Sequence, residues 1–182
     1  MRSSMRCSTM FLVIAMVCGL GLHLSVAQAQ EVRTLSIPAH ALSVAPSGTI
    51  ITPTALGLQW QRNFQAGARF FVHRPSDYSG GDVTFSIFFQ TTSETAGVVD
   101  FFIRPDSFNS GEGFEDIINL SASGVSVSGR AGFGTLYEQQ FTIPASRLAG
   151  DWWTSNIQRE GETSTYMDDV IVLAVALQYQ GK

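Results

Sequence analysis

Short segments in which apolar and polar residues alternate run through most of this chain, and they constrain its fold more than any other feature. In the segment 83–90, one side of the chain carries Val83, Phe85, Ile87 and Phe89. A period of two is that of a half-buried β-strand. Glycine, proline, serine, asparagine and aspartate gather between such segments and are typical of turns. The pattern therefore predicts strands joined by tight turns.

The expected strands are spaced as in a sandwich or a barrel. They are 56–63, 67–73, 83–90, 98–104, 117–122, 125–128, 136–143, 152–159 and 170–179. The last of them is apolar on both faces, so we expect it to be central and buried. Helix signals are nearly absent, the segment 105–113 reads as a loop, and 144–148 reads as a turn. We predict an all-β fold, an antiparallel β-sandwich of jelly-roll type with about 8–10 strands.

The first 29 residues have the three parts of a cleavable export signal. Arg2 and Arg6 precede an apolar run, and small residues stand at Ala27 and Ala29, where signal peptidase requires them. The run is shorter than the roughly 20 residues of a membrane-spanning helix. We expect a signal peptide (1–29), an N-terminal arm or edge strand (30–55) and a β-sandwich domain (56–182). The expected location is outside the cell or in the periplasm.

Cleavage after Ala29 would change the composition of the chain. Both cysteines, Cys7 and Cys18, would be lost, so the remaining chain would have no disulfide and no thiolate chemistry. Loss of two arginines would make the formal net charge of −4 still more negative. An acidic chain without a basic cluster does not favour nucleic acid or an anionic membrane surface as a partner.

Three segments carry a resemblance to known proteins. They are the turn motif 74–84 (RPSDYSGGDVT), the strand end 157–160 (IQRE) and the closing strand 172–179 (VLAVALQY). Together they resemble an uncharacterised jelly-roll-like β-sandwich module of secreted and phage-associated proteins. The resemblance spans about Trp60 to Tyr179, and its motifs mark turns and strands. It implies a sandwich fold, with no assigned activity and no catalytic residues.

Aromatic side chains are the first candidates for a binding site, because exposed rings can stack on sugars. The candidates for such a platform are Trp60, Tyr78, Trp152 and Trp153. Trp152 and Trp153 are neighbours on an expected strand, so one should point inward and the other outward. The pairs 70–71 and 101–102 should likewise each place one phenylalanine on an outer face.

An oxygen-rich loop is the second candidate site. Its candidate calcium ligands are Asp106, Asn109, Glu112, Glu115 and Asp116. Calcium takes six to eight oxygen ligands, often from such loops. Phe108 and Ile117 occupy positions where an EF-hand has ligands, so the loop is no EF-hand. A looser calcium site and a solvated acidic loop are the two remaining interpretations.

Signatures of catalysis are scarce in the sequence. The histidines beyond the signal, His40 and His73, lack zinc-site spacing, and no G-x-S-x-G motif occurs. Glu138, Glu160 and Glu162 are candidates for the carboxylate pair of a glycosidase. We therefore expect a secreted, non-catalytic protein with a structural, self-assembly or surface-interaction role, its partner being further copies of itself. The alternatives are an extracellular carbohydrate-binding module that binds polysaccharide, with calcium as a candidate cofactor, and a secreted glycoside-type hydrolase.

Overall fold

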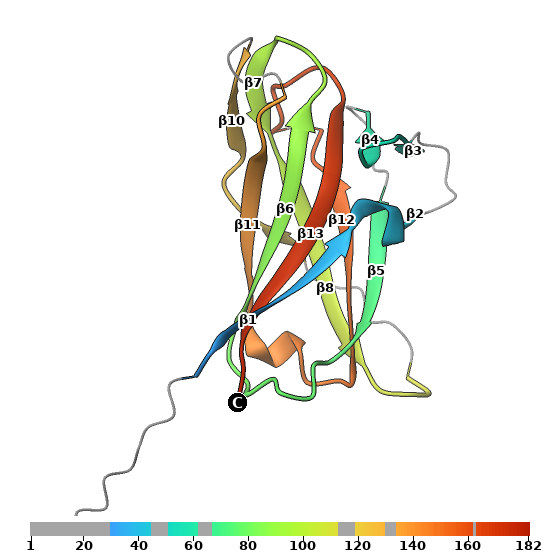
Figure 1. Cartoon of the computed structure of the whole chain (residues 1–182), viewed down its shortest axis with the longest axis vertical. Coiled ribbons are helices and arrows are strands. Elements are labelled where there is room, and N and C mark those ends of the chain that lie inside the picture. Colours follow the sequence, from blue (N-terminus) through green and yellow to red (C-terminus); the bar gives the residue numbers. More distant parts are fainter. Residues whose placement is uncertain (1–29, 45–50, 62–66, 113–118, 130–133, 162) are drawn as a thin grey trace, which may run out of the picture.

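The structure, a computed structural model, describes residues 30–44, 51–61, 67–112, 119–129, 134–161 and 163–182, so the expected signal peptide lies outside the described residues. Two antiparallel sheets pack face to face, with a two-stranded sheet at one end (Figure 1). The strands are β1 (Val32–Pro38), β2 (Ser43–Val44), β3 (Ile51–Pro53), β4 (Leu58–Trp60), β5 (Gly67–His73), β6 (Val83–Thr91), β7 (Ala96–Val99), β8 (Phe101–Phe108), β9 (Leu120–Ser121), β10 (Val125–Ser128), β11 (Tyr137–Ile143), β12 (Trp152–Arg159) and β13 (Val170–Gln180). Two short 3-10 helices are described, η1 (Ala39–Ala41) and η3 (Ala145–Arg147).

The strand order is that of the antiparallel jelly-roll sandwich predicted from the sequence. The first sheet has the order β11-β6-β13-β4-β3, and β1 also pairs with β13. The second sheet has the order β2-β5-β12-β8-β9, and β7 pairs with β10. From β5 onward the long strands alternate between the sheets, because β5, β8 and β12 lie in one and β6, β11 and β13 in the other. Each of these connections therefore crosses from sheet to sheet.

The closing strand β13 is central, as its apolar sequence predicts. It pairs with β6 along one side and with β4 and β1 along the other. Leu177 lies opposite Phe85 of β6 and Leu35 of β1. The register shifts between Val172 and Ala174, where an extra residue bends the strand.

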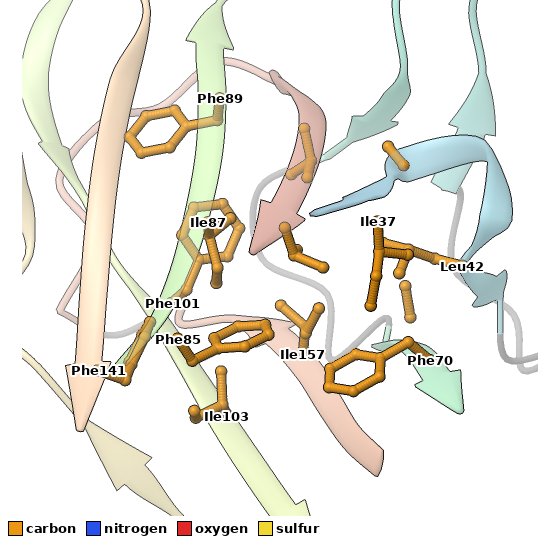
Figure 2. Packing of buried hydrophobic residues seen from close by; sticks show 14 of the residues in the cluster. Ile37, Leu42, Phe70, Phe85, Ile87, Phe89, Phe101, Ile103, Phe141 and Ile157 are labelled. Carbon is orange, nitrogen blue, oxygen red and sulfur yellow. The ribbon is translucent and has the colours of Figure 1, made fainter. Parts of the chain in front are cut away.

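The core lies between the two sheets (Figure 2). Phe85, Ile87 and Phe89 of β6 all point into it and are fully buried, as the alternation predicts. Phe85 stacks on Phe70 from the second sheet with ring centroids 5.7 Å apart, and Phe89 meets Phe101 edge-on at 5.5 Å. Rings from the two sheets thus interlock across the sandwich.

The expected strand 98–104 is in fact two strands, which meet at Asp100. β7 ends at Val99 and belongs to the small sheet, whereas β8 begins at Phe101 and belongs to the second sheet. Gln139 donates to Asp100 Oδ1 at 2.8 Å, and Thr163 donates to Oδ2 at 2.6 Å. These bonds satisfy a buried carboxylate where the chain changes sheets, a tertiary feature that alternation alone does not encode.

The expected loop at 105–113 was wrong in its first part, because β8 continues through Pro105 to Phe108. Pro105 lies opposite Ser155 of β12. Among the described residues, β9 pairs with Phe102 and Ile103 alone, so no described strand pairs with Pro105 on the side away from β12. Proline is tolerated there because an edge position needs no ladder hydrogen bond from its missing N–H.

Residues 30–55 contribute strands to both sheets. β1 pairs with β13 from Val32 opposite Gln180 to Pro38 opposite Ala174, and β2 pairs with β5. Pro38 and Pro53 are the last residues of β1 and β3, positions where proline interrupts no further pairing. Within the part of the chain that the structure describes, no helix is long and apolar enough to cross a membrane.

The turn motif that carries the resemblance joins β5 to β6. Gly80 and Gly81 have φ angles of 97° and 93°, a region that side chains disfavour. The hydroxyl of Tyr78 donates to the carbonyl of Gly81, and the Tyr78 N–H donates to Pro75 O at 3.1 Å. The sandwich that the resemblance implied is confirmed, and its motif serves to close this turn.

Candidate functional site

Alternation along β5, β8 and β12 sends every second side chain to the outer face of the second sheet. We call this surface the aromatic face. Its members are Arg69, Phe71, His73, Phe102, Arg104, Asp106, Phe108, Trp152, Thr154, Asn156 and Gln158. The register sets them in rows, with Trp152 between His73 and Phe108, Thr154 between Phe71 and Asp106, and Asn156 between Arg69 and Arg104.

Four rings gather at one end of the aromatic face. The rings of Trp152 and Phe71 are 37% and 45% exposed, and His73 is exposed as well. The imidazole of His73 meets the Trp152 ring edge-on, with centroids 5.3 Å apart. Phe71 meets Phe108 edge-on at 6.5 Å. Because edge-to-face pairs hold rings in fixed orientations, the group forms an ordered aromatic surface open to solvent.

A small side chain allows the Phe71–Phe108 contact. Thr154 of β12 lies opposite Phe71 in the register, on the strand that separates β5 from β8. Its hydroxyl donates to the carbonyl of Phe70 at 2.6 Å, and the residue is only 4% exposed. Thr154 is thus folded down against β5, and the two larger rings approach each other from the flanking strands.

Polar side chains occupy the next row of the aromatic face. Within the described residues, the amide of Asn156 and the indole N–H of Trp152 make no hydrogen bond. Gly67 leaves room for the Asn156 amide, since a Cβ at Gly67 would lie 2.3 Å from Asn156 Oδ1. Trp152 and Asn156 are four residues apart on one strand, which corresponds to about 13 Å. A ligand lying along β12 could meet both the rings and the amide.

The loops at the aromatic end are held by a clamp between β5 and β12. The Arg74 guanidinium donates to Asp151 Oδ1 at 3.1 Å and to Ala149 O at 3.0 Å. The N–H of Gly150 donates to Ser107 Oγ at 3.0 Å, and a Cβ at Gly150 would lie 2.4 Å from Phe108 N. This close packing fixes the start of β12 beside the end of β8, and with it Trp152 beside Phe108.

The structure separates the four predicted platform residues. Trp153 and Trp60 are 1% and 0% exposed, so the expectation that they offer a ring to a ligand is wrong. Trp152 is the outward member of its pair, as strand alternation requires. Tyr78 is partly buried against Trp153, with centroids 4.9 Å apart, and burial raises the pKa of its hydroxyl. Trp152 alone among the four lies on the aromatic face.

The predicted calcium ligands are divided between a strand and the turn after it. Asp106 lies on the aromatic face, and its Oδ1 accepts from the N–H of Ser107 at 2.8 Å. Glu112 accepts from the backbone N–H of Asn109 at 2.8 Å, and this bond lowers the pKa of the Glu112 carboxyl. Asn109 Oδ1 accepts from the N–H of Asp151 at 3.3 Å. These oxygens therefore help to close the turn.

Two of the five predicted ligands, Glu115 and Asp116, lie outside the described residues. Among the residues that the structure does describe, no three acidic, histidine or cysteine side chains are grouped so that they could hold a metal ion. Calcium binding by this loop stays a prediction.

The glutamates that were candidates for a glycosidase carboxylate pair also lie on separate elements. Glu138 lies on the outer face of the first sheet, where it accepts a hydrogen bond from Gln140 at 2.8 Å. Glu160 follows β12, and its backbone N–H donates to Asp100 O at 2.9 Å. Glu162 lies outside the described residues. Glu138 thus belongs to a strand of the first sheet, whereas Glu160 follows a strand of the second.

Most residues of the aromatic face carry no signal in the local sequence. Alternation could show that one phenylalanine of the pair 70–71 points outward, and Phe71 does. Phe108 was assigned to a loop, and Arg69, Arg104 and Asn156 carry no motif. Their grouping depends on the strand order β5-β12-β8, which places residues far apart in sequence in one row.

No family model and no curated protein matches the chain. Similar solved structures include the CBM36-1 domain of a multidomain xylanase from the hindgut metagenome of Trinervitermes trinervoides, at 10% identity, with 82% of this chain and 100% of that chain covered and a TM-score of 0.49.

Two further similar structures are of the same kind. The xylan-binding module CBM15 has 15% identity, 85% and 100% coverage and a TM-score of 0.48. The C-terminal CBM6 of LamC, a laminarinase from the marine Zobellia galactanivorans, has 15% identity, 80% and 98% coverage and a TM-score of 0.46. Likenesses this distant carry no inference about what this chain binds.

Proposed function

We propose that this protein is a non-catalytic module that binds a polysaccharide on the aromatic face. The observation that carries the proposal is the exposed ring of Trp152, ordered beside His73 and Phe108 and sharing a strand with the amide of Asn156. Ring faces pack against the C–H faces of sugars, and planar amide and guanidinium groups bond their hydroxyls. Sites that bind small molecules combine the same two kinds of group.

The composition of this surface favours a sugar over a second copy of the chain. A self-assembly interface requires a continuous apolar patch that exclusion from water would drive together. Here Phe71 shares its row with Asp106, and the next row contains Asn156 and Arg104. Covering the face with protein would desolvate those polar groups, whereas a glycan can pair with them.

The test compares rings on the two outer surfaces of the sandwich. Trp152→Ala and Phe71→Ala should each weaken retention in polysaccharide-containing gels by about tenfold or more, because central aromatic residues dominate binding energies. Phe88→Ala, on the outer side of β6, is the matched control and should leave retention unchanged.

Thermal melting confirms that each variant is folded. Wild-type retention by a folded Trp152→Ala/Phe71→Ala double variant would contradict the proposal. Concentration-dependent light scattering that Trp152→Ala abolishes, without retention of the wild type on any polysaccharide, would instead support self-assembly.

Export is part of the proposal, since extracellular polysaccharide is met outside the cytoplasm. It is supported by the signal-like segment 1–29 with its small residues at Ala27 and Ala29. Mass spectrometry of protein recovered from the periplasm or the medium should show a chain that begins at Gln30. Recovery of uncleaved chain from the cytoplasm alone would contradict it.

A further inference from the structure

Two arginines flank Asn156 on the aromatic face, and the Asn156 amide makes no hydrogen bond to any described residue. In the register, Asn156 lies opposite Arg69 on one side and opposite Arg104 on the other. Two strand spacings separate the arginine backbones, which corresponds to about 10 Å. Both side chains belong to the outer side of the sheet, in the same row as the amide.

The described part of this face carries more positive than negative charge, although the whole chain is negative. The protein has a formal net charge of −4, with 11 basic and 15 acidic residues. On the aromatic face, Asp106 is the one carboxylate beside Arg69 and Arg104 among the described members. The corresponding rows of the first sheet contain Glu138 and no basic residue. A basic row on an acidic molecule attracts anions to that place.

Arg104 is held in position by its neighbours. Its Nε donates to Asn119 Oδ1 at 2.6 Å, and its guanidinium carbon lies 5.4 Å from the centre of the Phe102 ring. A guanidinium carries five N–H donors in a planar fork, and this fork matches the two oxygens of a carboxylate. A fork held by a side contact loses less conformational freedom when it binds.

We propose that the polysaccharide bound by this protein is acidic, and that Arg69 and Arg104 pair with the carboxylates of its uronic acid residues. This inference rests on the proposed function. The rings of Phe71 and Trp152 would stack on sugar faces. The arginines, in the row that follows Phe71, would pair with the carboxylates. Sulfate esters offer similar oxyanion chemistry, so the experiment separates the two groups.

The experiment measures affinity for matched polymers by isothermal titration calorimetry and gel retention. The probes are polygalacturonate, alginate and glucuronoxylan, each beside its carboxyl-reduced form, together with a sulfated galactan. We expect the wild type to bind at least one polyuronate about tenfold or more tightly than its reduced form, because hydrogen bonds to charged groups are among the stronger ones. The preference should shrink as salt is raised.

The Arg69→Gln/Arg104→Gln double variant should lose this preference. Arg33→Gln removes one positive charge from a half-exposed position on β1, away from the aromatic face, and should keep the preference. If the double variant does not fold, Arg69→Lys and Arg104→Lys test whether the planar fork is needed. The ratio of wild-type affinities for the native and the carboxyl-reduced polymer still tests whether the ligand is acidic.

The outcomes separate this inference from the proposed function. Equal binding of native and reduced polymers would overturn the acidic ligand and leave polysaccharide binding in place. Binding of the sulfated galactan without any polyuronate would overturn the assignment to carboxylates. Failure of the wild type to bind any polysaccharide would overturn the proposed function itself.

Discussion

The two outer faces of the sandwich are built by the same alternation and yet differ in chemistry. The outer face of the first sheet, which we call the plain face, is formed by β11, β6 and β13. Its members are Thr84, Ser86, Phe88, Gln90, Glu138, Gln140, Thr142, Ala174, Ala176 and Gln178. They are mostly small or uncharged, and Phe88 is the one ring.

The aromatic face has the same strand geometry with larger and more polar side chains. Rings at Phe71, Phe108 and Trp152 lie beside ionic groups, and Asn156 and Trp152 keep polar atoms without hydrogen bonds inside the described residues. Stability alone does not require such groups, because the plain face is a sheet of the same kind without them. The proposed binding of a ligand by the aromatic face would explain this difference.

The largest expected difference in stability is between alanine variants of two neighbouring phenylalanines of β5. Phe70 is 3% exposed and stacks on Phe85, whereas Phe71 is 45% exposed on the aromatic face. Phe70→Ala should lower the free energy of unfolding by about 3–5 kcal/mol, because it leaves a cavity between the sheets. Phe71→Ala should cost about 1 kcal/mol or less. Urea denaturation measures both values.

Ligand binding should show the opposite order. Folded Phe70→Ala should keep its polysaccharide retention, and Phe71→Ala should lose it. Equal losses of stability in the two variants would show that Phe71 is a structural residue and would remove the basis for separating the core from the aromatic face.

Alanine variants of two glycines should differ in stability by an intermediate amount. A Cβ at Gly57 would lie 2.1 Å from the carbonyl oxygen of Val172, so Gly57→Ala must displace backbone of β13. We expect a loss of about 1–3 kcal/mol in the free energy of unfolding. A Cβ at Gly67 meets the end of the Asn156 side chain, which can rotate. Gly67→Ala should therefore cost about 1 kcal/mol or less, because the end of a side chain gives way more easily than backbone does.

The Gly67→Ala variant also tests the site. Displacing the Asn156 amide should weaken polysaccharide retention several-fold while the melting temperature stays near that of the wild type. Unchanged retention would remove Asn156 from the binding surface, and wild-type stability of Gly57→Ala would contradict the packing of β13 against this turn.

The contrast between the faces also shows how far the sequence could predict this protein. A period of two identified β6 and the inward side of its residues, and it required that Trp152 and Trp153 point in opposite directions. Both follow from the local geometry of a strand. The buried closing strand followed from its composition, because apolar residues on both faces need cover on both.

What the sequence could not give is the lateral order of strands. Trp152 meets Phe108 and His73 only because β12 lies between β8 and β5. The break at Asp100 depends on Gln139 and Thr163, which are distant in sequence. The charged row across Asn156 arises in the same way. Each of these features rests on contacts between segments whose pairing no local pattern encodes.

The smallest expected effect is a loss of stability at alkaline pH, which should arise in the core and not on either outer face. Tyr179 donates to Asp77 Oδ1 at 3.0 Å, and burial, followed by this bond, raises the pKa of its hydroxyl above the usual value near 10. Because the folded state holds this proton more tightly, the stabilisation is complete below about pH 10 and is lost as pH rises through the raised pKa. Arginine stays charged over this range, so the aromatic face keeps its charge.

Tyr179→Phe should lower the free energy of unfolding by about 1 kcal/mol at pH 7, through loss of one hydrogen bond. Its melting temperature should then fall less steeply between pH 9 and pH 11 than that of the wild type, because the titrating group is gone. Tyr78, which lies 6.1 Å from Tyr179 between ring centroids and whose pKa is raised mainly by burial, should contribute in the same direction. An unchanged alkaline slope in the Tyr78→Phe/Tyr179→Phe double variant would show that alkaline unfolding begins away from these two tyrosines.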